Sequence, residues 1–150
     1  MAQRIAINGF GRIGRLTFRT AWDRHPHDFE IVAVNDPAGR HTGALLLEFD
    51  SNYGRFPHDV RTEPGYFCVD GRRIRVFRER DWTKLPWGDL GVDIVLECSG
   101  QGVTRERAAI HLEMGARRVI ISAPAKGDDV TIVMGVNEQD YDPDQHKIMS

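Results

Sequence analysis

The sequence predicts an α/β fold, a doubly wound and mostly parallel sheet with an antiparallel insertion, on three observations. Apolar runs typical of buried strands alternate with helical segments through most of the chain. A glycine-rich turn joins the first strand segment to the first helix segment. Turn pairs of the Pro-Gly and Asp-Gly type divide a stretch of β-forming residues near the middle. Strands that alternate with helices form parallel sheets, because each right-handed crossover brings the chain back to the same end of the sheet.

The first fifty residues are expected to form a strand, a glycine turn, a helix, a second strand and a second helix. Residues 4–8 and 29–34 carry nearly continuous apolar runs, as strands do when both faces of the sheet are covered. Helices are expected over residues 12–24, where Pro26 ends the first one, and over residues 42–49.

The antiparallel insertion is expected between residues 53 and 80. Its β-forming segments and hairpin turns are, in order, 60–62, Pro64-Gly65, 66–69, Asp70-Gly71 and 74–77. A connecting segment over residues 81–90 leads back to the parallel part of the sheet.

The parallel pattern then resumes and continues to the end of the chain. The expected elements are a strand over 92–98, a helix over 104–114 that Thr104 begins and Gly115 ends, and strands over 118–122 and 131–136. No linker or repeat divides the sequence, so residues 1–150 are expected to form one domain.

The glycine turn has the context that a dinucleotide site requires. Gly9, Gly11 and Gly14 follow a strand and open a helix, and Asp36 ends the second strand 22 residues beyond Gly14. Such glycines allow a tight turn, close approach of the pyrophosphate and close packing of the helix, while the acid accepts bonds from a ribose hydroxyl. The alternative is a glycine-rich turn with an unrelated aspartate. The order of all four elements favours the dinucleotide site, a Rossmann fold.

Asp36 also favours NAD over NADP. A 2′-phosphate beside this carboxylate would be repelled by roughly 1 to 4 kcal/mol per unit charge. Arg40 and His41 are close enough in sequence to offset part of that repulsion, although the following helix is expected to expose them.

Composition and charge exclude several other classes of function. The formal net charge of −2 and the pI near 6.3 give no electrostatic reason to bind nucleic acid or an anionic membrane. No apolar run is long enough for a signal peptide or a membrane span. Two cysteines do not form a disulfide framework, and the six histidines show no metal-ligand spacing, so we expect a cytoplasmic protein without a metal.

In order along the chain, AINGFGRIGR, VAVNDP, ECSG, GARRVIISAPAK and VMGVN resemble glyceraldehyde-3-phosphate dehydrogenase over the whole length. The resemblance implies an NAD-binding Rossmann domain from an enzyme of glycolysis. In that family Asp36 matches the acid that binds the ribose, and Arg12 and Ile13 match contacts of the dinucleotide behind the turn. Asn8 and Asn35 match polar residues that flank the cofactor.

The remaining cofactor positions lie at the ends of later strands. Topology alone predicts that Ser99-Gly100 and Ser122 lie across the crevice from the glycine turn. The resemblance further implies that Ser99 and Gly100 lie beside the nicotinamide half, that Ser122 contacts the cofactor, and that Arg80 lies near the adenine end. The complete predicted set is Asn8, Gly9, Gly11, Arg12, Ile13, Gly14, Asn35, Asp36, Arg80, Ser99, Gly100 and Ser122.

The catalytic machinery that the resemblance implies is absent from these 150 residues. Family members continue beyond a strand like that ending at Ser150 into a segment with the nucleophilic cysteine, and a second half carries the catalytic histidine. For the intact enzyme the resemblance implies that a thiolate attacks the aldehyde, that hydride passes to NAD and that phosphate releases an acyl phosphate. We expect Cys68 and Cys98 to be packed as small apolar residues. The chain is therefore expected to bind the cofactor without turnover.

Two other interpretations remain open at this stage. Erythrose-4-phosphate dehydrogenases share much of the pattern, and the missing half would distinguish them. A freestanding dinucleotide-binding module is the alternative from a different class, although KIMS ends the chain within strand-like sequence. The implied partners are the cofactor, the catalytic domain and, in the intact family, a homotetramer. Apolar surface left uncovered around the crevice predicts self-association.

Overall fold

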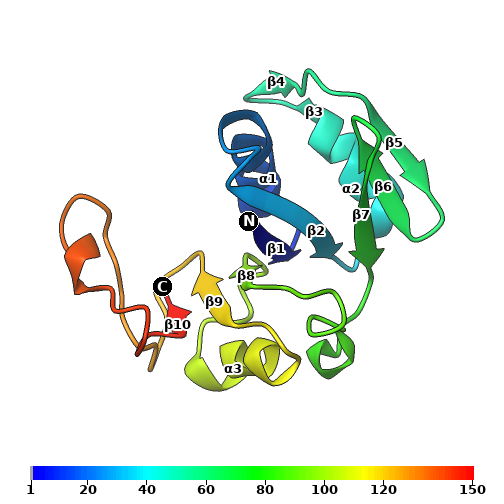
Figure 1. The fold of residues 1–150 in the computed structure, drawn as a ribbon. Coiled ribbons are helices and arrows are strands. Elements are labelled where there is room, and N and C mark those ends of the chain that lie inside the picture. The colour runs from blue at the N-terminus through cyan, green and yellow to red at the C-terminus, as the bar shows by residue number, and fades with distance from the viewer. Residues whose placement is uncertain (1) are drawn as a thin grey trace.

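The computed structural model describes residues 2–150, which form an eight-stranded sheet with helices on both faces (Figure 1). The elements in chain order are β1 (Gln3–Asn8), α1 (Arg12–Arg24), β2 (Phe29–Asn35), α2 (Gly39–Glu48), β3 (Phe49–Asp50), β4 (Gly54–Arg55), β5 (Val60–Glu63), β6 (Tyr66–Val69), β7 (Arg72–Phe77), a 3-10 turn (Trp82–Lys84), β8 (Ile94–Glu97), α3 (Arg105–Glu113), β9 (Arg118–Ile121), a second 3-10 turn (Glu138–Asp140) and β10 (Ile148–Met149).

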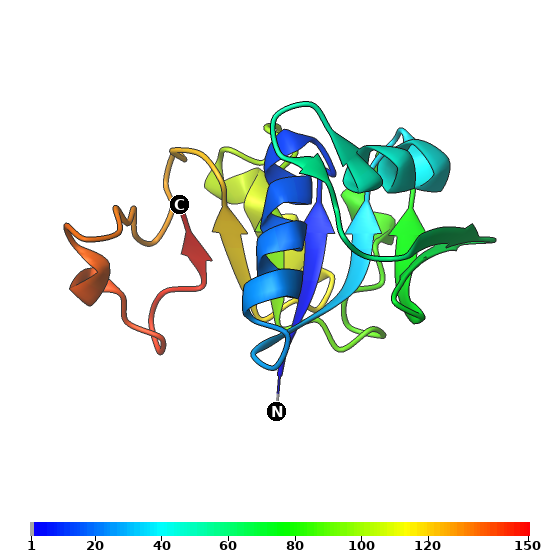
Figure 2. The same cartoon turned by 90° about the horizontal axis from the view of Figure 1, so that it is seen from above.

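The sheet has the order β10-β9-β8-β1-β2-β7-β6-β5, so the first strand of the chain lies near its centre. Strands β10, β9, β8, β1, β2 and β7 pair in parallel, and β7, β6 and β5 pair antiparallel. Figure 2 shows that the parallel strands point the same way, so their carboxyl ends share one edge. The strand order reverses direction at β1, which places a ligand crevice at that edge. The predicted doubly wound, mostly parallel sheet with an antiparallel insertion is confirmed.

Alternation along β1 explains the two layers of helices. Ile5 and Ile7 face the core that includes Phe18 of α1 and Leu47 of α2, whereas Ala6 faces a second core. Successive residues of a strand point to opposite faces, so one short strand contributes to both cores. The second core contains Trp82 and Trp87 from the connection between β7 and β8, and α3 lies on the same side (Figure 1).

The antiparallel insertion is joined to the parallel sheet more closely than expected. Its hairpins form at the predicted turns, with Gly65 and Gly71 at positive φ. Its last strand, β7, pairs in parallel with β2, from Ala33 opposite Arg75 to Asn35 opposite Phe77. The insertion therefore extends the main sheet, and residues 78–82 emerge at the carboxyl end of β2.

The strand predicted over residues 131–136 is wrong. Val133, Met134 and Val136 are exposed, with 57%, 80% and 70% of their surface accessible. Asn137 turns the segment back on itself, since its side chain accepts from the backbone N–H of Val133 and donates to the carbonyl of Thr131. Val130 bridges Met149 of β10 and the Ile132 N–H donates to the Ser150 carbonyl, but beyond Ile132 the segment leaves β10 and loops past that edge of the sheet (Figure 2).

Candidate functional site

Three buried polar side chains form a row across the carboxyl ends of adjacent strands. Asn8 is the last residue of β1 and is in register with Asn35 of β2 on one side and Glu97 of β8 on the other. All three are at most 2% exposed. Burying a polar group costs free energy unless the group is hydrogen-bonded. Three such groups side by side therefore indicate a functional role for this edge of the sheet.

The row is connected by side-chain hydrogen bonds. Asn35 Nδ2 donates to Asn8 Oδ1 at 2.7 Å, and Asn8 Nδ2 donates to Glu97 Oε2 at 2.5 Å. At its outer end Asn35 Oδ1 accepts from the backbone N–H of Glu79 at 2.8 Å. At the other end Glu97 Oε1 accepts from the backbone N–H of Ser99 at 2.8 Å and from the Ser99 hydroxyl. The row thus fixes the loops that follow β7 and β8.

Glu97 is held as a carboxylate. Burial alone would raise the pKa of Glu97, but hydrogen bonds from His111, Asn8 and Ser99 outweigh that cost, and the pKa lies below its usual value. An ionised carboxylate only accepts hydrogen bonds, which matches the four donors around it.

The glycine turn fits tightly between β1 and the neighbouring loop. Gly9 has φ of +91°, and a Cβ there would lie 2.4 Å from the backbone nitrogen of Ser99. A Cβ at Gly14 would lie 2.3 Å from the carbonyl oxygen of Gly9. A Cβ at Gly11 would meet no atom within 4 Å among the described residues. The first and third glycines therefore permit packing within the protein, whereas the space beside Gly11 is open for a ligand.

Helix α1 begins directly after this open space. Across residues 2–150 no side chain caps its start, and its first turn contains no acidic residue. Backbone N–H groups and the positive end of the helix dipole at such a start favour an anion. Open space beside Gly11 and an uncapped helix together fit a pyrophosphate.

Asp36 lies at the side of the turn, directly after β2. Its Oδ2 accepts from the backbone N–H of Phe10 at 2.7 Å, and its Oδ1 accepts from that of Ala38 at 2.8 Å. Each carboxylate oxygen has a second lone pair for a ribose hydroxyl. The geometry thus fits the role predicted for this acid.

A crevice of about 300 Å³ follows the carboxyl ends of these strands. It brings together seven of the twelve predicted residues, which are Asn8, Gly9, Gly11, Asn35, Asp36, Arg80 and Ser99. The remaining five lie around it. Arg12 and Ile13 are exposed in the first turn of α1, and Gly14 is buried beneath the turn. Gly100 is exposed beyond Ser99, and Ser122 is exposed after β9.

The crevice also has walls that the sequence analysis did not include. Trp82, Glu79, Pro37, Cys98 and Gln101 line it. Glu97 lies beneath it, and the available signal was an acidic residue inside the otherwise apolar run IVLEC. Trp82 lies at the crevice because β7 pairs in parallel with β2 and ends beside it. The sequence patterns did not reveal this pairing.

Comparison with known proteins agrees with this geometry. The family described as "Glyceraldehyde 3-phosphate dehydrogenase, NAD binding domain" matches residues 3–105. The chain belongs to the glyceraldehyde-3-phosphate dehydrogenase family. It is 54% identical over 150 residues to glyceraldehyde-3-phosphate dehydrogenase 1 of Streptomyces arenae, covering 100% of this chain and 45% of that protein.

Other members of the glyceraldehyde-3-phosphate dehydrogenase family give the same picture. The enzyme of Geobacillus stearothermophilus is 52% identical over 150 residues, which is 100% of this chain and 44% of that protein. That of Thermotoga maritima is 50% identical over 147 residues, or 98% of this chain and 44% of that protein. The chain thus spans less than half the length of these relatives, and NAD is the cofactor of the matched domain.

Both cysteines of this family member are free thiols. Cys68 is buried in β6, whereas Cys98 is half-buried at the crevice wall, which differs from the expected core position. Burial raises the pKa of both thiols, and the nearby Glu63 and Glu97 charges act in the same direction. Thiols are poor nucleophiles when they are protonated, so the environment does not activate either one.

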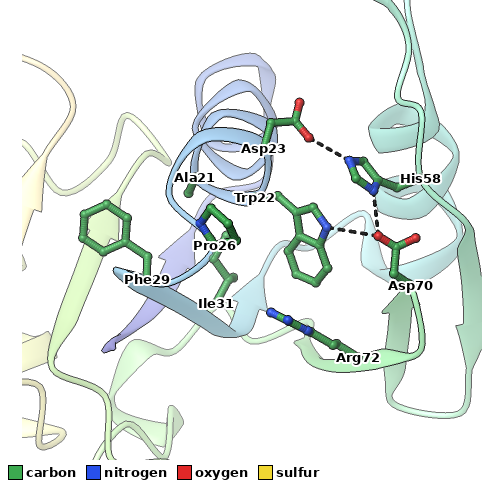
Figure 3. A pocket seen from close by; sticks show the side chains of 9 residues that line it. All are labelled: Ala21, Trp22, Asp23, Pro26, Phe29, Ile31, His58, Asp70 and Arg72. Atoms are coloured by element: carbon green, nitrogen blue, oxygen red, sulfur yellow. Dashed lines mark hydrogen bonds and ion pairs between the residues drawn. The ribbon is translucent and has the colours of Figure 1, made fainter. Parts of the chain in front are cut away.

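A second hollow, of about 360 Å³, lies far from the glycine turn, beside the end of α1 and the beginning of β2 (Figure 3). Its floor includes Trp22 and Ile31, and His58 at its rim bridges Asp23 and Asp70. In this family fold a ligand binds at the carboxyl ends of the strands, and this hollow is at the opposite end of β2. The crevice beside Gly11 is therefore the candidate cofactor site.

The described residues contain no cluster of three or more His, Cys, Asp or Glu side chains that could hold a metal ion. Across residues 2–150, no helix has both the length and the apolar character needed to cross a bilayer.

Proposed function

We propose that this chain is the cofactor-binding part of a phosphorylating glyceraldehyde-3-phosphate dehydrogenase. The observation that carries the proposal is the crevice at the carboxyl ends of β1, β2 and β8, where open space beside Gly11 adjoins Asp36. In the intact enzyme an aldehyde is oxidised to an acyl phosphate, and NAD supplies the acceptor for the hydride.

Each predicted residue has a role in this proposal. The first turn of α1, with Gly11, Arg12 and Ile13, binds the pyrophosphate through backbone N–H groups. Asp36 accepts hydrogen bonds from the adenosine ribose, and Arg80 lies toward the adenine end. Asn8 and Asn35 form the floor, while Gly9 and Gly14 allow the turn to pack as closely as it does. Ser99 lines the opposite wall, and Gly100 and Ser122 lie beyond it at the ends of β8 and β9.

These residues bind and orient the cofactor and exclude water from the floor of the crevice. The nucleophile belongs, in this proposal, to a part of the protein outside these 150 residues, because neither thiol described above is activated. The relatives, of which the chain covers 44–45%, have the additional length for such a part.

We extend the proposal to partners and location. A catalytic domain packs against this one at the crevice, and the intact protein assembles as a homotetramer, as implied by the family resemblance. The same resemblance and the two free thiols support a cytoplasmic protein, since reducing compartments keep thiols unpaired.

Calorimetric titration of the chain with NAD, and then with NADP, tests the proposal. Gly11→Val should fold normally, because a Cβ at this position meets no atom within 4 Å in the described structure, but it should weaken NAD binding by blocking the ligand. Gly88→Ala is a matched control, since its Cβ makes only ordinary contacts, the nearest at 3.5 Å from the Met114 carbonyl oxygen. A folded chain that binds no NAD, or that binds equally well with valine in place of Gly11, would contradict the proposal.

A further inference from the structure

The polar row beneath the crevice continues into helix α3. Glu97 Oε2 lies 3.0 Å from His111 Nε2, and Trp87 Nε1 donates to His111 Nδ1 at 3.0 Å. His111 is 0% exposed and Glu97 is 1% exposed. This buried group of Trp87, His111 and Glu97 is not explained by contact with the cofactor, because His111 lies on α3 behind the carboxylate.

The direction of these hydrogen bonds fixes the protons on His111. An indole N–H can only donate, so Nδ1 of His111 accepts and carries no proton. A neutral imidazole with a free Nδ1 carries its proton on Nε2, and that proton points to the Glu97 carboxylate. Trp87 therefore selects the tautomer in which His111 is a donor to Glu97.

Glu97 transmits this contact to the walls of the crevice. Its Oε2 accepts hydrogen bonds from His111 and Asn8, and its Oε1 accepts from the backbone N–H and the hydroxyl of Ser99. A Cβ at Gly102 would lie 2.6 Å from Glu97 Cγ, so the chain closes directly over the carboxylate. The carboxylate can hold Asn8 and Ser99 in place only if its own position is fixed, and the hydrogen bond from His111 fixes it.

The His111 ring also supports a second wall. It stacks on the indole of Trp82 with centroids 4.9 Å apart and planes 21° from parallel. Trp82 lines the crevice directly. One imidazole thus supports the crevice twice, by a hydrogen bond through Glu97 and by packing through Trp82.

We propose that His111 is a positioning residue of the cofactor site, acting through Glu97 in its Nε2-protonated neutral form. The inference rests on the proposed function and deepens it, because it assigns a role to a side chain that does not touch the cofactor. It predicts that removing the Nε2–H donor loosens Ser99 and Asn8 while the stacking on Trp82 persists.

The pair His111→Phe and His111→Gln separates these contributions. Phe keeps a ring against Trp82 but cannot donate, whereas Gln restores an N–H toward Glu97. We expect Phe to weaken NAD binding about tenfold or more, since it leaves buried groups without their partner, and Gln to recover most of the affinity. Val119→Ala is the control, because Val119 is 0% exposed in β9 and lies outside the network, so it lowers stability without altering the site.

Equal NAD affinity in the Phe variant and the wild-type chain would overturn the inference. So would a weakening no larger than that of Val119→Ala at matched thermal stability. The Ser99 amide signal provides a second measurement that needs no ligand, and His111→Phe should shift it and speed its hydrogen exchange. If the wild-type chain bound no NAD, the proposed function would fail, while an unchanged Ser99 amide would separately refute the role of His111.

Nitrogen-15 NMR of the wild-type chain with labelled histidine determines the tautomer of His111 directly. This measurement tests the inference even where a variant does not fold. The expected spectrum shows His111 with a protonated Nε2 and a bare Nδ1. A proton on Nδ1, or a doubly protonated ring in the folded chain at neutral pH, would overturn the assignment. Trp87→Phe removes the donor to Nδ1, so His111 should then be free to carry its proton on either ring nitrogen.

Discussion

The backbone N–H of Phe10 donates to the carboxylate of Asp36 at 2.7 Å, so the end of β2 holds the middle of the glycine turn. The Phe10 ring in turn packs against Phe18 and Phe67, with centroids 5.8 and 5.5 Å away. The acid proposed to bind the ribose therefore also shapes the turn proposed to bind the pyrophosphate. A substitution at Asp36 should affect both functions.

We expect Asp36→Ala to weaken NAD binding and to destabilise the fold by about 1–2 kcal/mol, because the N–H groups of Phe10 and Ala38 lose their acceptor. Asp36→Asn keeps an oxygen but removes the charge, so it should lower the preference for NAD over NADP with a smaller loss of stability. Urea unfolding and titration with both cofactors measure the two effects. An Asp36→Asn variant that still rejects NADP as strongly as wild type would show that the charge does not set the preference.

Asp129 should make the end of the chain sensitive to acid. Its carboxylate accepts hydrogen bonds from the backbone N–H groups of Lys147 and Ile148 and forms an ion pair with Arg105. Burial alone would raise the pKa of Asp129, but these interactions outweigh burial and lower the pKa to about 2. The stabilisation is present above the ordinary pKa of 3.8 and is lost as pH falls from about 4 to about 2. The shift corresponds to about 2 kcal/mol at neutral pH.

The measurement is urea unfolding at several pH values, with hydrogen exchange at Lys147 and Ile148. Asp129→Asn should lose this part of the acid dependence, and Asp129→Ala, which leaves no acceptor, should also lose the protection of both amides. Asp128→Asn is the control, because Asp128 bonds to Thr131 and Ser150 but not to these two amides. Unchanged protection in the Asp129→Ala variant would refute the role of this side chain in holding β10.

His58 should stabilise the fold below neutral pH. Its Nδ1 lies 2.6 Å from Asp70 and its Nε2 lies 2.7 Å from Asp23, so both nitrogens donate only when the ring is charged (Figure 3). Partial burial alone would lower the pKa of His58, but bonds to the two carboxylates outweigh it and raise the pKa above 6.5. The contribution is therefore complete below 6.5 and is lost as pH rises through the higher, folded-state value.

An NMR titration of the six histidines locates the pKa of His58, and denaturant unfolding across the same range measures its effect. His58→Gln should be less stable at pH 6 and should approach wild-type stability as pH rises. A His58 that titrates at or below 6.5 in the folded chain would contradict this prediction.

Self-association of this chain remains a prediction, and the structure suggests where it occurs. Ile13 is exposed beside the crevice, and the other large exposed apolar side chains gather in residues 45–53 and 133–136. Light scattering should show association that rises with concentration, and Met134→Glu with Val136→Glu should reduce it. Leu45→Glu tests the other segment separately. A clean monomer over a wide concentration range would refute the prediction.

The sequence was sufficient for features fixed by local chemistry. The glycine turn, the acid after the second strand and the hairpin turns can each be recognised from short runs of sequence, although the final shape of the glycine turn also depends on Asp36 and Ser99. Thr104 begins α3 as expected, with its side chain accepting from Arg107, and Gly115 follows its end at φ of +102°. Each of these patterns identifies a backbone conformation that few other residues could adopt or stabilise.

Features set by pairing between distant segments could not be predicted in this way. The parallel contact of β7 with β2 and the stacking of Trp82 on His111 depend on the folded chain. The run at 131–136 has the composition of a strand, but it follows β10 only as far as Ile132, and the side chain of Asn137 then turns it away. His111 could have been packed or exposed by sequence alone, and only its distance from Glu97 reveals its chemistry.

The central position of β1 has a consequence for the order in which the molecule is made. Residues 3–8 leave the ribosome before the strands that flank them, yet Ile5 pairs with Ile94, and Gly9 packs against Ser99. Contacts between such distant parts of a chain form slowly, because a long loop must close first. The glycine turn is therefore among the earliest of these segments to be synthesised and among the last to reach its binding shape, so a nascent chain can acquire cofactor only after β8 and Ser99 have emerged.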